Sequence, residues 1–142
     1  MVFKNGENQL NVEYSFDEKK FDEIARECGS KRVRESVAYL RRAYYLNKSN
    51  VLCCEVDECC FFMGTCGSKH FRLLEIAVKE DMQGQGYGDI LMTLMKSICK
   101  KRGLQKITLR TSKDETAKEF FKKYGGQVVG EKDTDYEMEI RL

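Results

Sequence analysis

The residues with the clearest capacity for chemistry form a glycine-rich turn, QGQGYG, at positions 83–88. The turn follows an apolar strand pattern that ends at Val78 and opens a helical pattern that begins near Gly86. The first N–H groups of a helix have no partner within the helix, and the helix dipole favours negative charge there. Because glycine has no Cβ, the backbone can also approach an anion closely. The turn therefore predicts a phosphate site, formed by Gln83, Gly84, Gln85, Gly86, Tyr87 and Gly88.

The sequence around the turn limits which phosphate ligand it serves. A P-loop is excluded because no Gly-Lys-Ser/Thr follows the glycines. A dinucleotide-binding unit would open the fold and carry an acidic residue after its next strand, whereas here that strand ends in Arg110, Thr111 and Ser112. Two interpretations remain: a coenzyme A site, and a turn that is tight for structural reasons alone.

The elements that position the turn follow from the spacing of apolar residues. Strands are expected at 10–16, 51–56, 59–66, 70–78, 105–111, 127–132 and 135–142. Helices are expected around the apolar stripes at 21–28, 33–44, 87–99 and 117–124. Capping boxes at Ser15 with Glu18 and at Ser112 with Glu115 predict where the first and last helices begin, and Ser30 can cap the second.

This order of elements predicts the fold class. The chain is expected to form a single domain over residues 1–142, of mixed α/β class, with a central, mostly antiparallel sheet flanked by about four helices. Strand 70–78, the helix after the turn and strand 105–111 form one βαβ unit, whose two strands should be parallel.

The charge composition favours no particular class of macromolecular partner. The 25 basic and 23 acidic residues leave a net charge of +2, which favours neither nucleic acid nor an acidic membrane surface. No apolar run approaches the length of a membrane span, and the N-terminal segment MVFKNGENQL lacks the apolar stretch of a secretory signal. A soluble cytoplasmic protein is expected.

The seven cysteines are the other conspicuous feature of the composition. Cys53, Cys54, Cys59 and Cys60 form two adjacent pairs within apolar strand patterns, so neighbouring thiols should point to opposite faces of the sheet. A metal site needs ligands that converge. Buried free thiols are therefore expected rather than a metal site or a disulfide.

With these elements in place, the segment IAVKEDMQGQGYGDILMTLM resembles the cofactor motif of the GNAT superfamily of acyl-CoA N-acyltransferases. That motif is an apolar strand, a short connector and Gln/Arg-x-x-Gly-x-Gly/Ala at the start of a helix. The segment DETAKEFFKKYGG is similar to the motif that follows in that superfamily. The two segments span about half of the chain, and they imply the GNAT-like fold with acetyl-CoA as co-substrate.

The resemblance also implies roles for particular residues. The backbone groups of Ile76, Ala77 and Val78 would bind the pantetheine arm, and the amides of the turn would bind the pyrophosphate. Asp114 and Phe121 of the second motif would also border the cofactor. Glu75 occupies a place where some members carry the base that takes the proton of the amine, with an ion-paired strand carboxylate as the alternative.

Phe121 departs from the pattern, because many relatives place there a tyrosine that reprotonates the leaving thiolate. Tyr124, one turn further along the helix, is a second catalytic candidate, with packing in the core as the alternative. His70 is the only histidine and begins the same strand as Glu75, where exposure at the end of a strand is the simpler interpretation.

The function expected from the resemblance is transfer of an acetyl group directly from acetyl-CoA to an amine, in a small molecule, a peptide or a protein. A non-catalytic acyl-CoA-binding module is the alternative that Phe121 suggests, and nucleic-acid binding through the basic second helix is a weaker one. The Arg34, Arg41 and Arg42 face of that helix suggests an acidic acceptor. The sequence does not distinguish a monomer from a homodimer.

Overall fold

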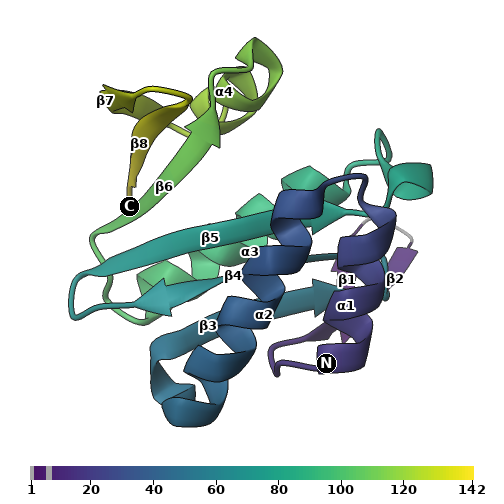
Figure 1. Cartoon of the computed structure of the whole chain (residues 1–142). Helices are drawn as coiled ribbons and strands as arrows, with labels where there is room; N and C mark the ends of the chain where they lie inside the picture. The colour runs from purple at the N-terminus through teal and green to yellow at the C-terminus, as the bar shows by residue number, and fades with distance from the viewer. Residues whose placement is uncertain (1, 6–7) are drawn as a thin grey trace.

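The structure, a computed structural model, describes residues 2–5 and 8–142, and side chains from residue 9 onward except those of residues 31, 34 and 36. In this part of the chain, eight strands form one sheet in the order β1-β2-β3-β4-β5-β6-β8-β7 (Figure 1). The strands are β1 (Val2–Asn5), β2 (Asn8–Glu13), β3 (Val51–Val56), β4 (Cys60–Cys66), β5 (His70–Val78), β6 (Lys106–Ser112), β7 (Gly126–Lys132) and β8 (Asp135–Arg141). The α-helices are α1 (Glu18–Glu27), α2 (Lys31–Leu46), α3 (Tyr87–Lys101) and α4 (Glu115–Lys122). The predicted mixed, mostly antiparallel sheet with four helices is confirmed.

The helices cover both faces of the sheet and divide the core in two. Figure 1 shows α1 and α2 on the near face and α3 on the far face. Successive side chains of β4 point to opposite faces of the sheet. Phe61 packs on the α1 and α2 side, and Phe62 packs on the α3 side. The chain therefore has two apolar clusters, one on each side of a single sheet.

The adjacent cysteines follow the same alternation. Cys53 belongs to the cluster under α1 and α2, and Cys54 belongs to the cluster under α3. All seven cysteines are free thiols. Burial raises the pKa of Cys53 and of Cys54 to about 12, so both thiols stay protonated at neutral pH. The predicted divergence of these neighbouring side chains is confirmed.

Two helix starts differ from the sequence prediction. The N-cap of α1 is Asp17, whose carboxylate accepts from the Lys20 N–H at 3.2 Å, rather than Ser15. Phe16, just before the cap, packs on Phe21 with ring centroids 5.0 Å apart, and this staple fixes where the helix begins. The N-cap of α4 is Asp114, which accepts from the Thr116 N–H, because Ser112 is still paired in β6.

Two further differences lie at the start of the chain. The strand expected at 10–16 is β2, which runs from Asn8 to Glu13, and β1 was not predicted. β1 has only four residues, too few for an alternating pattern to identify a strand.

Among the helices of the part that the structure describes, none combines the length and the apolar character that a membrane crossing requires.

The feature that positions the site is a divergence of β5 from β6. The two strands are parallel, as predicted, but the described ladder between them runs only from His70 with Lys106 to Arg72 with Thr108. Beyond these pairs, β5 continues along β4 and β6 continues along β8, so the two strands form a V (Figure 1). The remaining part of β5 thus borders an opening in the sheet.

A bulge opposite Gly64 accompanies this divergence. Met63 faces Glu75, but Gly64 faces Leu73, so Leu74 is the extra residue of β5. A Cβ on Gly64 would lie 2.1 Å from the Arg72 carbonyl oxygen and 2.7 Å from the Phe71 ring. Only glycine permits this approach, so Gly64 holds the bulge that bends β5.

Candidate active site

The glycine turn forms a hollow of about 240 Å³ at the end of β5. Gly84 and Gly86 adopt φ values of 80° and 88°, which side-chain-bearing residues rarely adopt. Nothing lies within 4 Å of the position that a Cβ would take at either residue. The backbone therefore presents an open concave surface at the N-terminus of α3, as an anion site requires. The hollow is lined by Val78, Met82, Gln83, Gly84, Gly86, Tyr87, Gly88, Asp89, Phe120 and Lys123.

Side chains on both sides hold the turn in this conformation. The Gln83 amide donates to the Val78 carbonyl at 3.1 Å and so closes the loop between strand and turn. The Tyr87 hydroxyl donates to the Asp57 carboxylate at 3.2 Å, and burial raises the pKa of this tyrosine. A Cβ on Gly88 would stand 3.1 Å from the Phe120 ring, which packs against the start of the helix. The hollow is thus built mainly from one short stretch of backbone.

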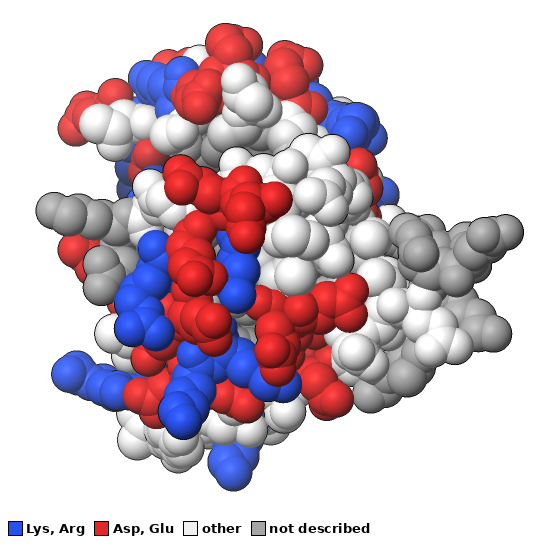
Figure 2. Space-filling model, turned by 90° about the vertical axis from the view of Figure 1, so that its right-hand side faces the viewer, with Lys and Arg blue, Asp and Glu red and all other residues white. Residues whose placement is uncertain are grey.

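The charges near the hollow are balanced. Lys123 lines the hollow and pairs with Asp89 across a distance of 3.1 Å. Figure 2, which looks at the right-hand side of Figure 1, shows acidic side chains gathered near the middle of this face, with basic ones mainly to the left and below and uncharged ones to the right. Because the described side chains of this face carry both signs of charge, attraction of an anion has to come from the helix N-terminus and Lys123.

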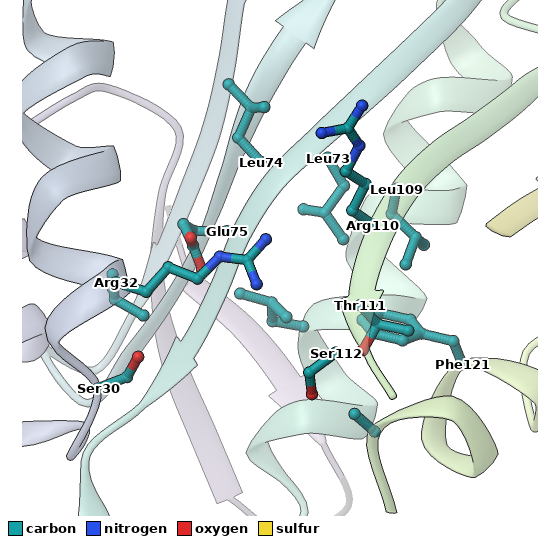
Figure 3. Close-up of a pocket in the computed structure, with 13 residues that line it drawn as sticks. Ser30, Arg32, Leu73, Leu74, Glu75, Leu109, Arg110, Thr111, Ser112 and Phe121 are labelled. Carbon is teal, nitrogen blue, oxygen red and sulfur yellow. The ribbon is translucent and has the colours of Figure 1, made fainter. Parts of the chain in front are cut away.

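A second hollow, of about 300 Å³, occupies the opening between β5 and β6 (Figure 3). We call it the cleft. Its walls come from four separate parts of the chain: the start of α2, the bent part of β5, the end of β6 and α4. The residues that line it are Ser30, Arg32, Val33, Leu73, Leu74, Glu75, Ile76, Leu109, Arg110, Thr111, Ser112, Ala117 and Phe121.

Glu75 is the one carboxylate among the residues that line the cleft, and the side chain is partly buried. The register pairs it with Met63, whose side chain packs on the α1 and α2 side of the sheet. Leu74, the extra residue of the bulge, packs on the same side. The bulge therefore turns Glu75 toward the start of α2, so that the cleft contains one acidic group.

One end of the cleft is bordered by a cluster of charges. Arg110 lines the cleft and donates to the Glu137 carboxylate, to which Arg72 also donates at 3.2 Å. Burial opposes ionisation of Glu137, but the two guanidinium groups prevail and lower the pKa of this carboxyl. Arg72 lines the neighbouring hollow, which includes His70 and Thr108. The cluster therefore separates the cleft from that hollow.

Arg32 lies on the opposite wall. It stands in the first turn of α2, and its guanidinium lies 3.7 Å from the Asp135 carboxylate at the start of β8. Figure 3 shows the side chain extending from the helix toward the opening between β5 and β6. The Arg32 side chain is 55% exposed, so water screens this ion pair. The pair therefore contributes little to the free energy of unfolding.

The structure brings together some of the predicted site residues and separates others. Glu75, Ile76 and Phe121 line the cleft, whereas Val78 lines the hollow of the turn together with five of the six turn residues. The sixth, Gln85, donates to the Asp81 carbonyl at 3.5 Å. Ala77 is buried under α1 and α2.

Other candidates lie outside both hollows. Tyr124 packs on Phe120 with ring centroids 5.4 Å apart and borders the core under α3, so it does not share the cleft with Glu75. The Asp114 carboxylate caps α4. His70 is exposed at the opposite end of β5. The side chain of Arg34 lies outside the described residues, and Arg41 donates to Glu18 on α1 at 2.6 Å.

Sequence reasoning missed the charged and hydroxyl groups of the cleft. Arg32, Arg110, Thr111 and Ser112 come from two segments that are far apart in the chain, and no motif joins them. A weak signal for Arg32 was available: the first turns of α1, α3 and α4 carry an acidic residue, whereas that of α2 carries none. A cation there opposes the helix dipole, so helix stability does not account for it.

Comparison with protein families gives one match. The model of the acetyltransferase (GNAT) family matches residues 19–126, which include β5, the glycine turn, α3, β6 and α4. A comparison with curated protein sequences finds no match.

Solved structures with the same fold cover nearly the whole chain. The PaiA N-acetyltransferase from Thermoplasma acidophilum, in complex with coenzyme A, is 20% identical, with a TM-score of 0.79 over 94% of this chain and 99% of that one. The ribosomal-protein-S18-alanine N-acetyltransferase from Escherichia coli is 15% identical, with a TM-score of 0.78 over 94% of each chain. An aminoglycoside 6'-N-acetyltransferase complexed with coenzyme A is 17% identical, with a TM-score of 0.70 over 92% of this chain and 96% of that one.

Proposed function

The chain belongs to the acetyltransferase (GNAT) family, and on that premise we propose that it transfers an acetyl group from acetyl-coenzyme A to the nitrogen of an amine. The observation that carries the proposal is the divergence of β5 from β6 directly before the glycine turn that opens α3. The edge of β5 that extends beyond its ladder with β6 therefore leads to the anion site of the glycine turn. This arrangement suits an extended arm that ends in phosphates.

The residues along this line fit acetyl-coenzyme A. The backbone groups of Ile76, Ala77 and Val78 would bind the pantetheine arm as a neighbouring strand does, and the N–H groups of the turn would hold the pyrophosphate. The open space at Gly84 and Gly86 leaves room for the phosphates. Lys123 would add a positive charge, and Phe121 of α4 would border the cofactor from the cleft. For Asp114, the N-cap of α4, the same role rests on the resemblance alone, because it lies outside both hollows.

Glu75 is proposed as the base. The thioester supplies an activated acyl carbon, and the cleft would align the amine nitrogen with it. Glu75 takes a proton from the ammonium form of the amine, directly or through a water molecule, and the lone pair that this frees forms the bond to the acyl carbon. N–H groups on the edge of β5 that faces away from β4 would stabilise the oxyanion. The carbon–sulfur bond then breaks, and the thiolate leaves.

The thiolate must take up a proton, and Phe121 has none to give. Phe121 is 7% exposed and lines the cleft that also contains Thr111 and Ser112 (Figure 3). We propose that one of these hydroxyl groups, or water, relays to the thiolate the proton that the amine nitrogen has lost, so that the hydroxyl is left protonated. Tyr124 remains a second candidate, although it would have to act from outside the cleft.

The proposed function is tested by incubating the protein with acetyl-coenzyme A and a panel of amines, with mass spectrometry of the products. The panel contains amino acids, a polyamine, an aminoglycoside and a peptide with a free N-terminus. Acetylated product from at least one amine is expected, and it should disappear with Gly86→Glu. Folded protein that binds acetyl-coenzyme A but acetylates no amine would contradict the proposal.

A non-catalytic acyl-CoA-binding module is the second candidate, favoured by Phe121 alone. It predicts binding of acetyl-coenzyme A without turnover of any amine in the same panel. Restoring a hydroxyl with Phe121→Tyr separates the two candidates. A variant that gains activity from an inactive parent would support the second candidate, and an active parent would exclude it.

A further inference from the structure

The cleft contains opposite charges that an amine alone would not use. Glu75 offers a carboxylate, and Arg32 and Arg110 offer guanidinium groups on two of the surrounding walls. An acceptor that enters as an ammonium ion finds its complement in Glu75 but meets the positive charge of both arginines. A second positive charge on the acceptor would therefore be repelled.

The two arginines differ in how firmly they are held. Arg110 shares Glu137 with Arg72, within hydrogen-bonding distance, on the wall that closes the cleft. Arg32 is paired with Asp135 at 3.7 Å, and more than half of the Arg32 side chain is exposed. Because the pair lies beyond hydrogen-bonding distance, an acidic group of a ligand can replace Asp135 at little cost.

The dipole of α2 does not explain why a cation stands at this position. The first turns of α1, α3 and α4 carry Glu18, Asp89 and Glu115, which suit the dipole of each helix. The first turn of α2 has no acidic residue. Arg32 and Val33 of this turn line the cleft. Arg32 therefore lies where it weakens the helix and where a ligand can reach it.

The size of the cleft limits the acceptor. Its volume of about 300 Å³ is at the lower end of the range for small-molecule sites. The cluster of Arg72, Arg110 and Glu137 closes one end and separates the cleft from the next hollow. A compact acceptor fits this space better than an extended chain.

We propose that the acceptor is a small amine that also carries an acidic group, a carboxylate or a phosphate, within a few bonds of the nitrogen, and that Arg32 binds this group. The inference rests on the proposed function and adds the class of acceptor. In this arrangement Glu75 faces the nitrogen and Arg32 faces the acid. Arg32 is thus a specificity residue, and its bond to the acid orients the nitrogen toward the thioester.

The test compares matched pairs of acceptors that differ only in the acidic group: phenylalanine with phenethylamine, lysine with cadaverine, and phosphoethanolamine with ethanolamine. The kcat/KM of each is measured by mass spectrometry of the acetylated product. In at least one pair, the wild type should prefer the acidic member by tenfold or more. The pair that shows the preference distinguishes a carboxylate from a phosphate.

Arg32→Gln should reduce this preference by roughly tenfold to a hundredfold, as expected for loss of a charged hydrogen bond, and Arg32→Lys should retain part of it. Arg42→Gln, at an exposed arginine of the same helix outside the cleft, should leave the preference unchanged. A structural role for Arg32 would instead lower both members of a pair equally, and that result would overturn the inference.

Failure of the inference and failure of the proposed function give different results. A wild type that acetylates the plain amines better than the acidic ones overturns the inference and leaves the function standing. A wild type that acetylates none of the six compounds and none of the broader panel overturns both. Calorimetric titration of the same pairs into protein saturated with coenzyme A provides a readout of selectivity that does not depend on turnover.

Discussion

The hollow of the glycine turn and the cleft between β5 and β6 are neighbouring sites built in opposite ways. Most of the lining of the hollow comes from residues 78–89, and its shape depends on backbone conformation at Gly84 and Gly86. The lining of the cleft comes from α2, β5, β6 and α4, and its character depends on side chains such as Glu75 and Arg32. A site made of local backbone is fixed by local sequence, whereas a site assembled from distant segments can change one side chain at a time.

The largest expected effect concerns the cleft. Glu75→Gln keeps the shape of the side chain but removes the base, so kcat should fall about 100-fold or more while the affinity for acetyl-coenzyme A stays the same. Steady-state kinetics and calorimetry measure the two quantities. Glu131→Gln, at an exposed glutamate of β7, is the matched control. A loss of only a few-fold would mean that Glu75 is an ion-paired strand residue. The cleft would then lack the base that distinguishes it from the hollow of the turn.

The next effect concerns the bulge that joins the two sites. Gly64→Ala would place a methyl group 2.1 Å from the Arg72 carbonyl oxygen, so β4 and β5 must move apart. We expect a loss of about 2–3 kcal/mol in the free energy of unfolding, measured by denaturant titration. Gly67→Ala is the control, because its Cβ would meet the His70 carbonyl at an ordinary 3.7 Å. Equal stability of the two variants would contradict the role of Gly64.

Some parts of the fold and of the site could be predicted from the sequence, and others could not. The glycine turn, the helix after it and the parallel strands were predictable because each follows from a periodic pattern or from residues adjacent in the chain. The helix starts were not, because Ser15 and Asp17 both satisfy the capping rule, and only the packing of Phe16 on Phe21 decides between them. The cleft was out of reach for a stronger reason. It lies beside a bulge in β5 that needs the close approach of Gly64, and its charges meet only after the chain has folded.

A smaller effect is expected at the wall of the cleft. The pKa of Glu137 is lowered in the folded protein from its ordinary value of 4.5, so its ion pairs contribute stability above that value, and this contribution is lost as the pH falls through the folded pKa. Glu137→Gln should therefore cost roughly 1 kcal/mol near neutral pH, and the difference from wild type should shrink below about pH 4.5. Denaturant titrations over a range of pH measure it.

The control for this prediction is Glu119→Gln, which removes an exposed carboxylate 3.7 Å from Lys122. Its effect should be close to zero at every pH. A difference between Glu137→Gln and wild type that does not vary with pH would show that the ion cluster does not stabilise this wall.

The smallest effect is expected at the start of α3. Gly88→Ala adds a methyl group 3.1 Å from the edge of the Phe120 ring, so the ring has to shift by a few tenths of an ångström. Affinity for acetyl-coenzyme A should fall by roughly threefold to tenfold, since the ring lines the hollow. Phe120→Leu in the same chain should recover part of the loss. If Gly88→Ala binds as tightly as wild type, the hollow is less dependent on close packing than its geometry indicates.

The central claim, that the glycine turn holds the pyrophosphate of acetyl-coenzyme A, is tested most directly by calorimetric titration of acetyl-coenzyme A into the wild type, Gly86→Glu and Gly103→Glu. Both glycines have a positive φ and open space around the Cβ position, so the two variants carry the same backbone strain, but only Gly86 lies in the hollow. The account predicts that the wild type and Gly103→Glu bind and that folded Gly86→Glu loses at least 100-fold in affinity. A wild type that does not bind, or a Gly86→Glu variant that binds as tightly as Gly103→Glu, would contradict it.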